Sequence, residues 1–432
     1  MTLYFKKRFI SKIILCLVCL VSWANAIELS GNVSTETDYS NNSNLVSTKK
    51  LDDVSQLVAL DLDVLENRKN LQANANFRVE SKRYFKNTFS DQTSLTAGFG
   101  LFNVDLIDSF LNWQTSFTRT EVLSDTADTN TPDNREYRNI LRTGPSISYQ
   151  VSRSSLLEYT LNYINVENSD ETASDSQRVN SDLNYMYLFN TVTDFSVNGQ
   201  YENVIDGEEN EEYENISFSL GLIRRFPLGD AQFNYGRTRL SPKRGGTTEG
   251  NYFDFQLIRR ELLWHDVSLM YFEDISDTSI GFENDEQGAD TENNTQRSAS
   301  NNDVVKRKSL TLSINRVLGS LSYTVNTFWE NETFVIQDSD EKSIGLSLAL
   351  NYNLTPRLAS EFQYSYQINN FMDRPDIDKD KVSSYQVGGA YSVASNFSVN
   401  SFIRFQARYN SQNMVREYEE FSTGFGLVWY FL

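Results

Sequence analysis

The sequence is poor in cysteine and histidine, and after its first 26 residues it has no long apolar run. The two cysteines, Cys16 and Cys19, both lie in those first residues. The rest of the chain therefore has no disulfides, which argues against a small disulfide-stapled fold. A transmembrane helix needs about 18 consecutive apolar residues, and none follow residue 26. These absences leave a large chain that must be stable without disulfides or a helical anchor.

The first 26 residues have the pattern of a secretory signal peptide. A basic start with Lys6, Lys7 and Arg8 precedes the apolar stretch 13–21, and Ala24-Asn25-Ala26 has the spacing of a cleavage site. We therefore predict that residues 1–26 are cleaved and that residues 27–432 form a single exported domain.

Charge and composition narrow the class of protein further. The net charge is −19, and the predicted signal peptide carries basic residues but no acidic ones. Such an acidic chain is not expected to bind nucleic acid, whose phosphates are met by cations. Aromatic residues make up 13% of the chain, yet its mean hydropathy is −0.48. This combination is typical of an outer-membrane β-barrel, whose strands face lipid on one side and water on the other.

Strict alternation of apolar and polar residues supports this interpretation. In the segment 71–80 the odd positions are apolar, from Leu71 to Val79, and the even positions are polar. The segments 344–353, 358–368 and 397–409 alternate in the same way. Such runs cover about 10–14 residues, which suits tilted membrane strands. The whole chain predicts an all-β, transmembrane, antiparallel up-and-down barrel of about 20 strands, with a range of about 16–22.

The connections between these segments alternate in length. Short turns near residues 67–70, 152–155 and 394–396 are separated by longer polar loops such as 41–53 and 124–135. Short periplasmic turns and longer external loops are typical of outer-membrane barrels. A soluble β-sandwich would have shorter strands, and a β-solenoid would show a fixed repeat, which we do not find. The expected location is the outer membrane of a Gram-negative bacterium.

The last residues predict a signal for barrel insertion. Gly426, Trp429 and Phe431 have the spacing found at the end of barrel strands that the insertion machinery reads, although Leu432 follows the final aromatic residue. The alternative is a buried terminal strand of a soluble domain.

The sequence offers little for catalysis, cofactors or metals. His265 is expected at a periplasmic turn, away from the external half where barrel enzymes hold their sites, so we predict a non-enzyme without a cofactor. Asp376, Asp378 and Asp380 alternate as in a calcium loop, but the glycine and the closing glutamate are missing. Solvated acidic loops are the simpler interpretation, and calcium bridging to lipopolysaccharide is the functional one.

Charged residues on the polar face of predicted strands are candidates for lining the lumen. They are Arg78, Arg142, Glu361, Arg404 and Arg408. Their position predicts a water-filled passage rather than a packed interior. The loop 274–303 has no apolar pattern and is a candidate to fold inward or cover the mouth. Arginines near periplasmic strand ends either reach lipid phosphates or form a basic mouth for an anionic solute.

Residues 130–145, Asn-Thr-Pro-Asp-Asn-Arg-Glu-Tyr-Arg-Asn-Ile-Leu-Arg-Thr-Gly-Pro, carry a family resemblance. A T-P-x-N-R loop running into a T-G-P strand resembles the outer-membrane proteins of PEP-CTERM/exosortase systems, which are similar to the porin 2 family of β-barrels. The rhythm of segments 159–163 and 182–188 is similar. The resemblance implies a barrel found near exopolysaccharide biosynthesis and export, and it assigns no functional residues.

Two functions remain open from the sequence. The first is a porin-like or export conduit for a secreted polysaccharide or small solutes. The second is a non-conducting structural barrel whose acidic loops bind cations, lipopolysaccharide or a matrix partner. Arginines on the lumen face favour the first, because a packed interior would not need them.

Overall fold

A computed structural model describes most of the chain after the predicted signal peptide. It covers residues 27–431 except 109, 124–128, 170–174, 207–211, 244–245, 263, 278–303, 336–338, 373–378 and 411–415. The predicted signal peptide lies outside the described residues, and so does most of the loop suggested as a plug. Within the described ranges the chain is almost entirely β-strand, with a short 3-10 turn, η1 (Pro132–Asn134).

Twenty antiparallel β-strands form one sheet, which confirms the predicted fold class. The strands are β1 (Glu28–Ser40), β2 (Asp53–Arg68), β3 (Leu71–Tyr84), β4 (Gln92–Ile107), β5 (Leu111–Leu123), β6 (Arg135–Ser152), β7 (Ser155–Asn168), β8 (Ser176–Asn190), β9 (Thr193–Asp206), β10 (Tyr213–Phe226), β11 (Gly229–Pro242), β12 (Thr248–Leu262), β13 (His265–Asp277), β14 (Val304–Leu318), β15 (Leu321–Phe334), β16 (Ser339–Thr355), β17 (Leu358–Phe371), β18 (Lys379–Ala394), β19 (Phe397–Asn410) and β20 (Tyr418–Phe431).

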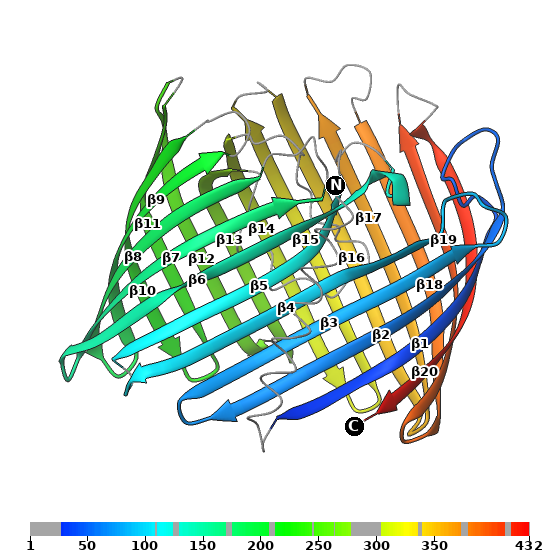
Figure 1. Cartoon of the computed structure of the whole chain (residues 1–432), viewed down its shortest axis with the longest axis horizontal. Helices are drawn as coiled ribbons and strands as arrows, with labels where there is room; N and C mark the ends of the chain where they lie inside the picture. Colours follow the sequence, from blue (N-terminus) through cyan, green and yellow to red (C-terminus); the bar gives the residue numbers. More distant parts are fainter. Residues whose placement is uncertain are drawn as a thin grey trace, which may run out of the picture.

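The sheet closes into a barrel (Figure 1). Each strand pairs with its neighbours along the sequence, and the first strand also pairs with the last. The β1–β20 register runs from Gly31 opposite Phe431 to Ser40 opposite Ser422. Closure removes the exposed edges that an open sheet would leave unpaired in the membrane, where water cannot satisfy them.

Connections alternate between short turns at one end of the barrel and longer segments at the other, as predicted. Turns such as 69–70, 153–154 and 395–396 lie at the end where β1 begins and β20 finishes. In an outer-membrane barrel this end is the periplasmic one. No helix in the described ranges is both long enough and apolar enough to cross a membrane.

The two faces of the wall differ in chemistry because side chains alternate along every strand. On β18 and β19 the outer face carries Tyr385 and Val387 opposite Phe405 and Ile403. These side chains are well exposed, with Val387 at 57%. On the inner face Gln386 lies opposite Arg404, and Ser384 opposite Gln406. The wall is therefore apolar outside and polar inside, as a lipid-embedded barrel requires.

The strands are longer than the sequence indicated. They run from 13 residues in β5 to 18 in β6, whereas a tilted strand needs about 9–11 residues to cross the hydrocarbon. The alternating pattern ends where the outward side chain no longer meets lipid, as at Lys381 near the start of β18. The backbone pairing continues beyond that point. The wall therefore extends past the membrane on the side of the long connections.

A substitution on β18 tests which face meets lipid. Val387→Arg, near the middle of the strand, should lower the free energy of unfolding by about 2–4 kcal/mol, because it places a cation at the bilayer midplane. Gln386→Arg, one residue earlier and on the inner face, should change it far less. Urea unfolding in lipid vesicles measures both. If the two variants lowered the free energy of unfolding equally, the face that carries Val387 would not be the one in contact with lipid.

Candidate functional site in the barrel lumen

The five residues predicted to line the lumen share the inner, polar face of the wall. Cross-strand register places Arg78 opposite Asp61, Arg142 opposite Ser116 and Glu361 opposite Gly388. Arg404 and Arg408 lie on the same face of β19, opposite Gln386 and Val382. The five residues come from strands spread around the barrel, so they do not form a single cluster.

Arginine–carboxylate pairs follow the inner wall. Arg78 Nε donates to Glu80 Oε1 at 2.5 Å, and its Nη1 lies 3.2 Å from the Asp61 carboxylate. Arg404 Nη2 lies 3.8 Å from Glu420, and its Nε donates to Ser422 Oγ at 3.2 Å. Each arginine is held by a neighbouring carboxylate or hydroxyl group, and the pair faces the water of the lumen rather than the lipid.

Asp380, a candidate for calcium binding, makes a buried ion pair instead. Its carboxylate accepts hydrogen bonds from Arg408 and from the amide of Asn410, and its side chain is 1% exposed. The other two candidates, Asp376 and Asp378, lie outside the described residues. Within the part of the chain that the structure describes, no group of three potential metal ligands comes together.

Three lumen arginines were not singled out from the sequence. Arg178 pairs with Glu202 at 3.2 Å, Arg307 with Glu330 at 3.1 Å, and Arg138 donates to Asn168 at 3.1 Å. All three are near the ends of strands on the side of the long connections. The alternation along each strand predicts that these arginines face the lumen. It does not predict their partners on the next strand, because these depend on the register between strands.

The β5–β6 hairpin ends in a compact tip, residues 129–135, which includes η1. Arg135 joins its two sides, because its Nη1 lies 3.0 Å from Glu121 and its Nε donates to Asn130 Oδ1 at 2.7 Å. Asn134 donates to the Thr129 carbonyl at 3.1 Å. Pro132 opens the 3-10 turn, where its fixed φ and missing N–H are tolerated. We call this segment the hairpin tip.

The hairpin leaves the wall before it reaches the tip. Pairing between β4 and β5 stops at Gly98 and Arg119, although β5 continues to Leu123. At this point Arg119 Nε donates to the Leu95 carbonyl at 2.5 Å, and its guanidinium lies 4.5 Å from the centre of the Tyr137 ring. Beyond it β5 has no backbone pairing with β4, so the hairpin can bend away from the sheet.

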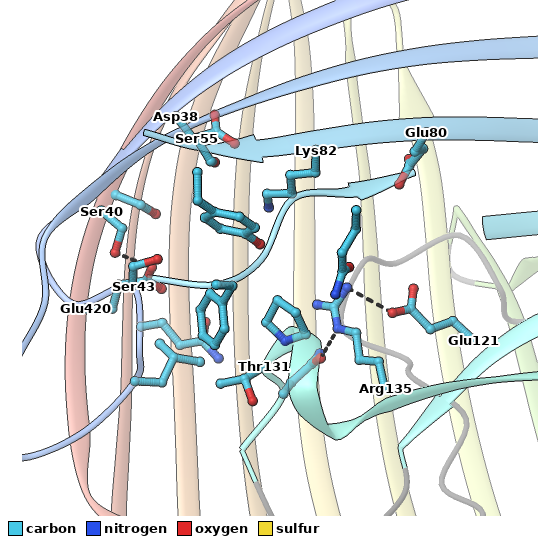
Figure 2. Close-up of a pocket in the computed structure, with 18 of the residues that line it drawn as sticks. Asp38, Ser40, Ser43, Ser55, Glu80, Lys82, Glu121, Thr131, Arg135 and Glu420 are labelled. Carbon is cyan, nitrogen blue, oxygen red and sulfur yellow. Dashed lines mark hydrogen bonds and ion pairs between the residues drawn. The ribbon is translucent and has the colours of Figure 1, made fainter. Parts of the chain in front are cut away.

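The hairpin tip lies inside the barrel (Figures 1 and 2). Its residues Asn130, Thr131 and Pro132 line the same cavity as residues of β3, β19 and β20. In the wall, β5 and β6 are separated from β19 and β20 by β1 to β4, so a loop that stayed above its own strands could not reach them. The tip therefore occupies part of the lumen cross-section.

The cavity between the hairpin tip and the wall measures about 210 Å³. Figure 2 shows Lys82 and Glu80 on the wall side and Thr131 and Arg135 on the hairpin side. At the β1–β20 seam, Ser40 donates to Glu420 Oε1 at 2.7 Å. We call this space the tip cavity.

His265 and the last strand occupy other places. The His265 ring contacts Tyr323 Oη at 2.5 Å, at the end with short turns, far along the strands from the tip cavity. Trp429 and Phe431 share the outer face of β20, with the Trp429 side chain 50% exposed and the two ring centroids 5.8 Å apart. Gly426 faces the lumen, where a Cβ would meet Asn400 Oδ1 at 2.1 Å.

A closed antiparallel barrel with an apolar outer wall and a charged inner wall defines this chain as a membrane-spanning β-barrel protein. No protein-family model and no curated protein matches its sequence.

Solved structures with a similar course of the chain are outer-membrane proteins. The FrpB iron transporter from Neisseria meningitidis has a TM-score of 0.48 and 9% identity, covering 93% of this chain and 82% of that one. The siderophore receptor PirA from Pseudomonas aeruginosa has a TM-score of 0.46 and 11% identity, covering 94% and 81%. OccK11 from the same organism has a TM-score of 0.42 and 9% identity, covering 94% and 96%. At these identities the likeness concerns the fold alone.

Proposed function

We propose that this protein is a porin-like conduit in the outer membrane of a Gram-negative bacterium. The observation that carries the proposal is a closed wall with a polar inner face and a hairpin tip inside it. Side chains cannot fill a barrel of this strand number, so the interior is left to water and to inward segments. A wet, charged passage with a local narrowing is the arrangement that passive diffusion uses.

Selection in such a passage depends on size and wall charge. The inner wall presents arginine–carboxylate pairs, such as those of Arg78 and Arg404, rather than a single sign of charge. A polar solute can exchange its hydration shell for these groups as it passes. No chemical step is needed, and we propose a non-enzymatic protein.

A finer proposal concerns the cargo. We infer a role beside an exopolysaccharide export or PEP-CTERM/exosortase system, which rests on the resemblance of residues 130–145. In support, that segment begins in the hairpin tip and continues into β6, so part of the family-like motif lies inside the lumen. A secreted polysaccharide that passed through the lumen would run alongside the hairpin tip.

Planar-bilayer recording of the refolded chain without residues 1–26 tests the conduit. We expect steady, stepwise single-channel openings, because a closed wall with a polar inner face can enclose a path for ions across the bilayer. A silent bilayer, with insertion verified by protease protection, would contradict the proposal. It would favour a structural barrel that uses its acidic external loops to bind cations, lipopolysaccharide or a matrix partner.

A further inference from the structure

Most charged groups that line the tip cavity have a close partner of opposite charge. Glu121 is 3.0 Å from Arg135, and Glu420 is 3.8 Å from Arg404. Glu80 is bound by Arg78, which lies just outside the cavity lining. These groups hold the hairpin tip and the wall in place, and their charges are already compensated.

Lys82 differs from them. It extends from the inner face of β3, and Figure 2 shows its ammonium directed into the cavity. Among the residues that the structure describes, it makes no hydrogen bond and no ion pair; its close contact is the Tyr84 ring, 5.5 Å from Nζ. Asp38, Glu80, Arg135 and Arg404 act on it only through longer-range electrostatics.

An ammonium in this position has unused hydrogen-bonding capacity. It carries three donors, and a ring face satisfies none of them as a carboxylate would. Arg135 and Arg404 line the same cavity from β6 and β19, but each is already paired with a carboxylate of the lining. Among the described residues, Lys82 is the cation of this lining that has no carboxylate within ion-pair distance. A carboxylate placed beside Lys82 could accept a charge-assisted hydrogen bond from this ammonium.

The rest of the lining suits a hydroxylated molecule. Gln92, Gln406 and Thr131 provide side chains that both donate and accept hydrogen bonds. Tyr84 and Phe89 form an edge-to-face pair with centroids 5.3 Å apart, which gives an apolar surface for a carbon chain. The volume of about 210 Å³ limits the occupant to a single small molecule or one unit of a longer one.

We propose that the tip cavity is a binding site for a small hydroxylated carboxylic acid, whose carboxylate is held by Lys82. The site deepens the proposed conduit, because it lies in the lumen between the hairpin tip and the wall. The role of this site in transport rests on the proposed conduit function, but ligand binding itself does not require that the barrel conducts.

Isothermal titration calorimetry with the folded chain in detergent micelles tests the site directly. Gluconate and sorbitol are matched probes, since they have the same six-carbon hydroxylated chain and differ in the carboxylate. We expect gluconate to bind about tenfold or more tightly than sorbitol, as the loss of a charge-assisted contact predicts. Lys82→Gln should remove this preference and Lys82→Arg should keep most of it.

The matched control is Lys69→Gln, in the turn between β2 and β3. The Lys69 side chain is 88% exposed and far from the tip cavity, so gluconate binding should be unchanged. Circular dichroism verifies that each variant is folded.

Three results would overturn the inference: equal binding of gluconate and sorbitol, unchanged gluconate binding in folded Lys82→Gln, or tighter binding of the cationic probe glucosamine. Bilayer conductance is recorded separately. A channel that conducts without preferring gluconate would keep the proposed function and reject this site, and a silent barrel that prefers gluconate would do the reverse.

Discussion

Replacing residues 129–134 of the hairpin tip by a short glycine–serine linker should raise single-channel conductance about twofold or more. The tip lies within the lumen, where it shares a cavity with Lys82 on β3 and Glu420 on β20. A wider water-filled cross-section carries more ions at the same voltage. Planar-bilayer recording of both proteins in the same salt measures the change.

The control places the same linker in the turn after β2, at Lys69-Asn70, which lies at the opposite end of the barrel. The single-channel conductance of this control variant should equal that of the original protein. If excision of the tip left conductance unaltered while the protein still inserted and conducted, the narrowest part of the passage would have to lie elsewhere.

Arg408→Leu should lower the free energy of unfolding by about 3–5 kcal/mol, because it leaves a buried carboxylate without its cation. Arg408 and Asp380 have side chains that are 7% and 1% exposed. Asn410 still donates to Asp380 in the variant, but an amide does not compensate a charge. Urea unfolding in micelles, followed by tryptophan fluorescence, measures the difference.

Two further variants separate this pair from a general effect of losing an arginine. Arg83→Leu, whose partner Asp91 lies 3.8 Å away, should cost about 1 kcal/mol or less, because the two side chains are 69% and 58% exposed. Removing both partners, with Arg408→Leu and Asp380→Leu together, should recover much of the stability. If Arg408→Leu cost no more than Arg83→Leu, the Arg408–Asp380 pair would behave as a solvent-screened one.

The strands were predictable from the sequence because lipid and water impose opposite demands on successive residues. In β3 the apolar positions from Leu71 to Val79 alternate without a break, and the observed strand begins at Leu71. Strand length was underestimated, since outward residues such as Lys381 need not be apolar beyond the hydrocarbon. The alternation also predicted that Arg78 and Arg404 lie on the polar face of their strands, and the structure places both on the inner face.

The site could not be predicted in the same way, because it depends on contacts between distant strands. The carboxylate of Asp380 looked like part of an acidic loop, yet β18 begins at Lys379 and pairs it with Arg408 on β19. The segment 124–135 looked like an ordinary external loop. Only the end of β4–β5 pairing at Arg119 lets the hairpin bend inward, and a missing pairing leaves no pattern in the sequence.

The strands are longer than the membrane requires, and this affects where along the barrel solutes would be selected. β6 has 18 residues, against the roughly 9–11 that hydrocarbon requires, and the excess forms a collar of sheet above the lipid tails. Asp380 and Arg408 lie close to the free ends of their strands, and the hairpin tip joins the upper ends of β5 and β6. A solute arriving from outside would therefore meet the Arg408–Asp380 pair and the tip cavity before it reached the depth of the acyl chains. Solutes would therefore be selected in a vestibule above the lipid tails, and the membrane-embedded part of the barrel would only conduct the solutes that had passed the vestibule.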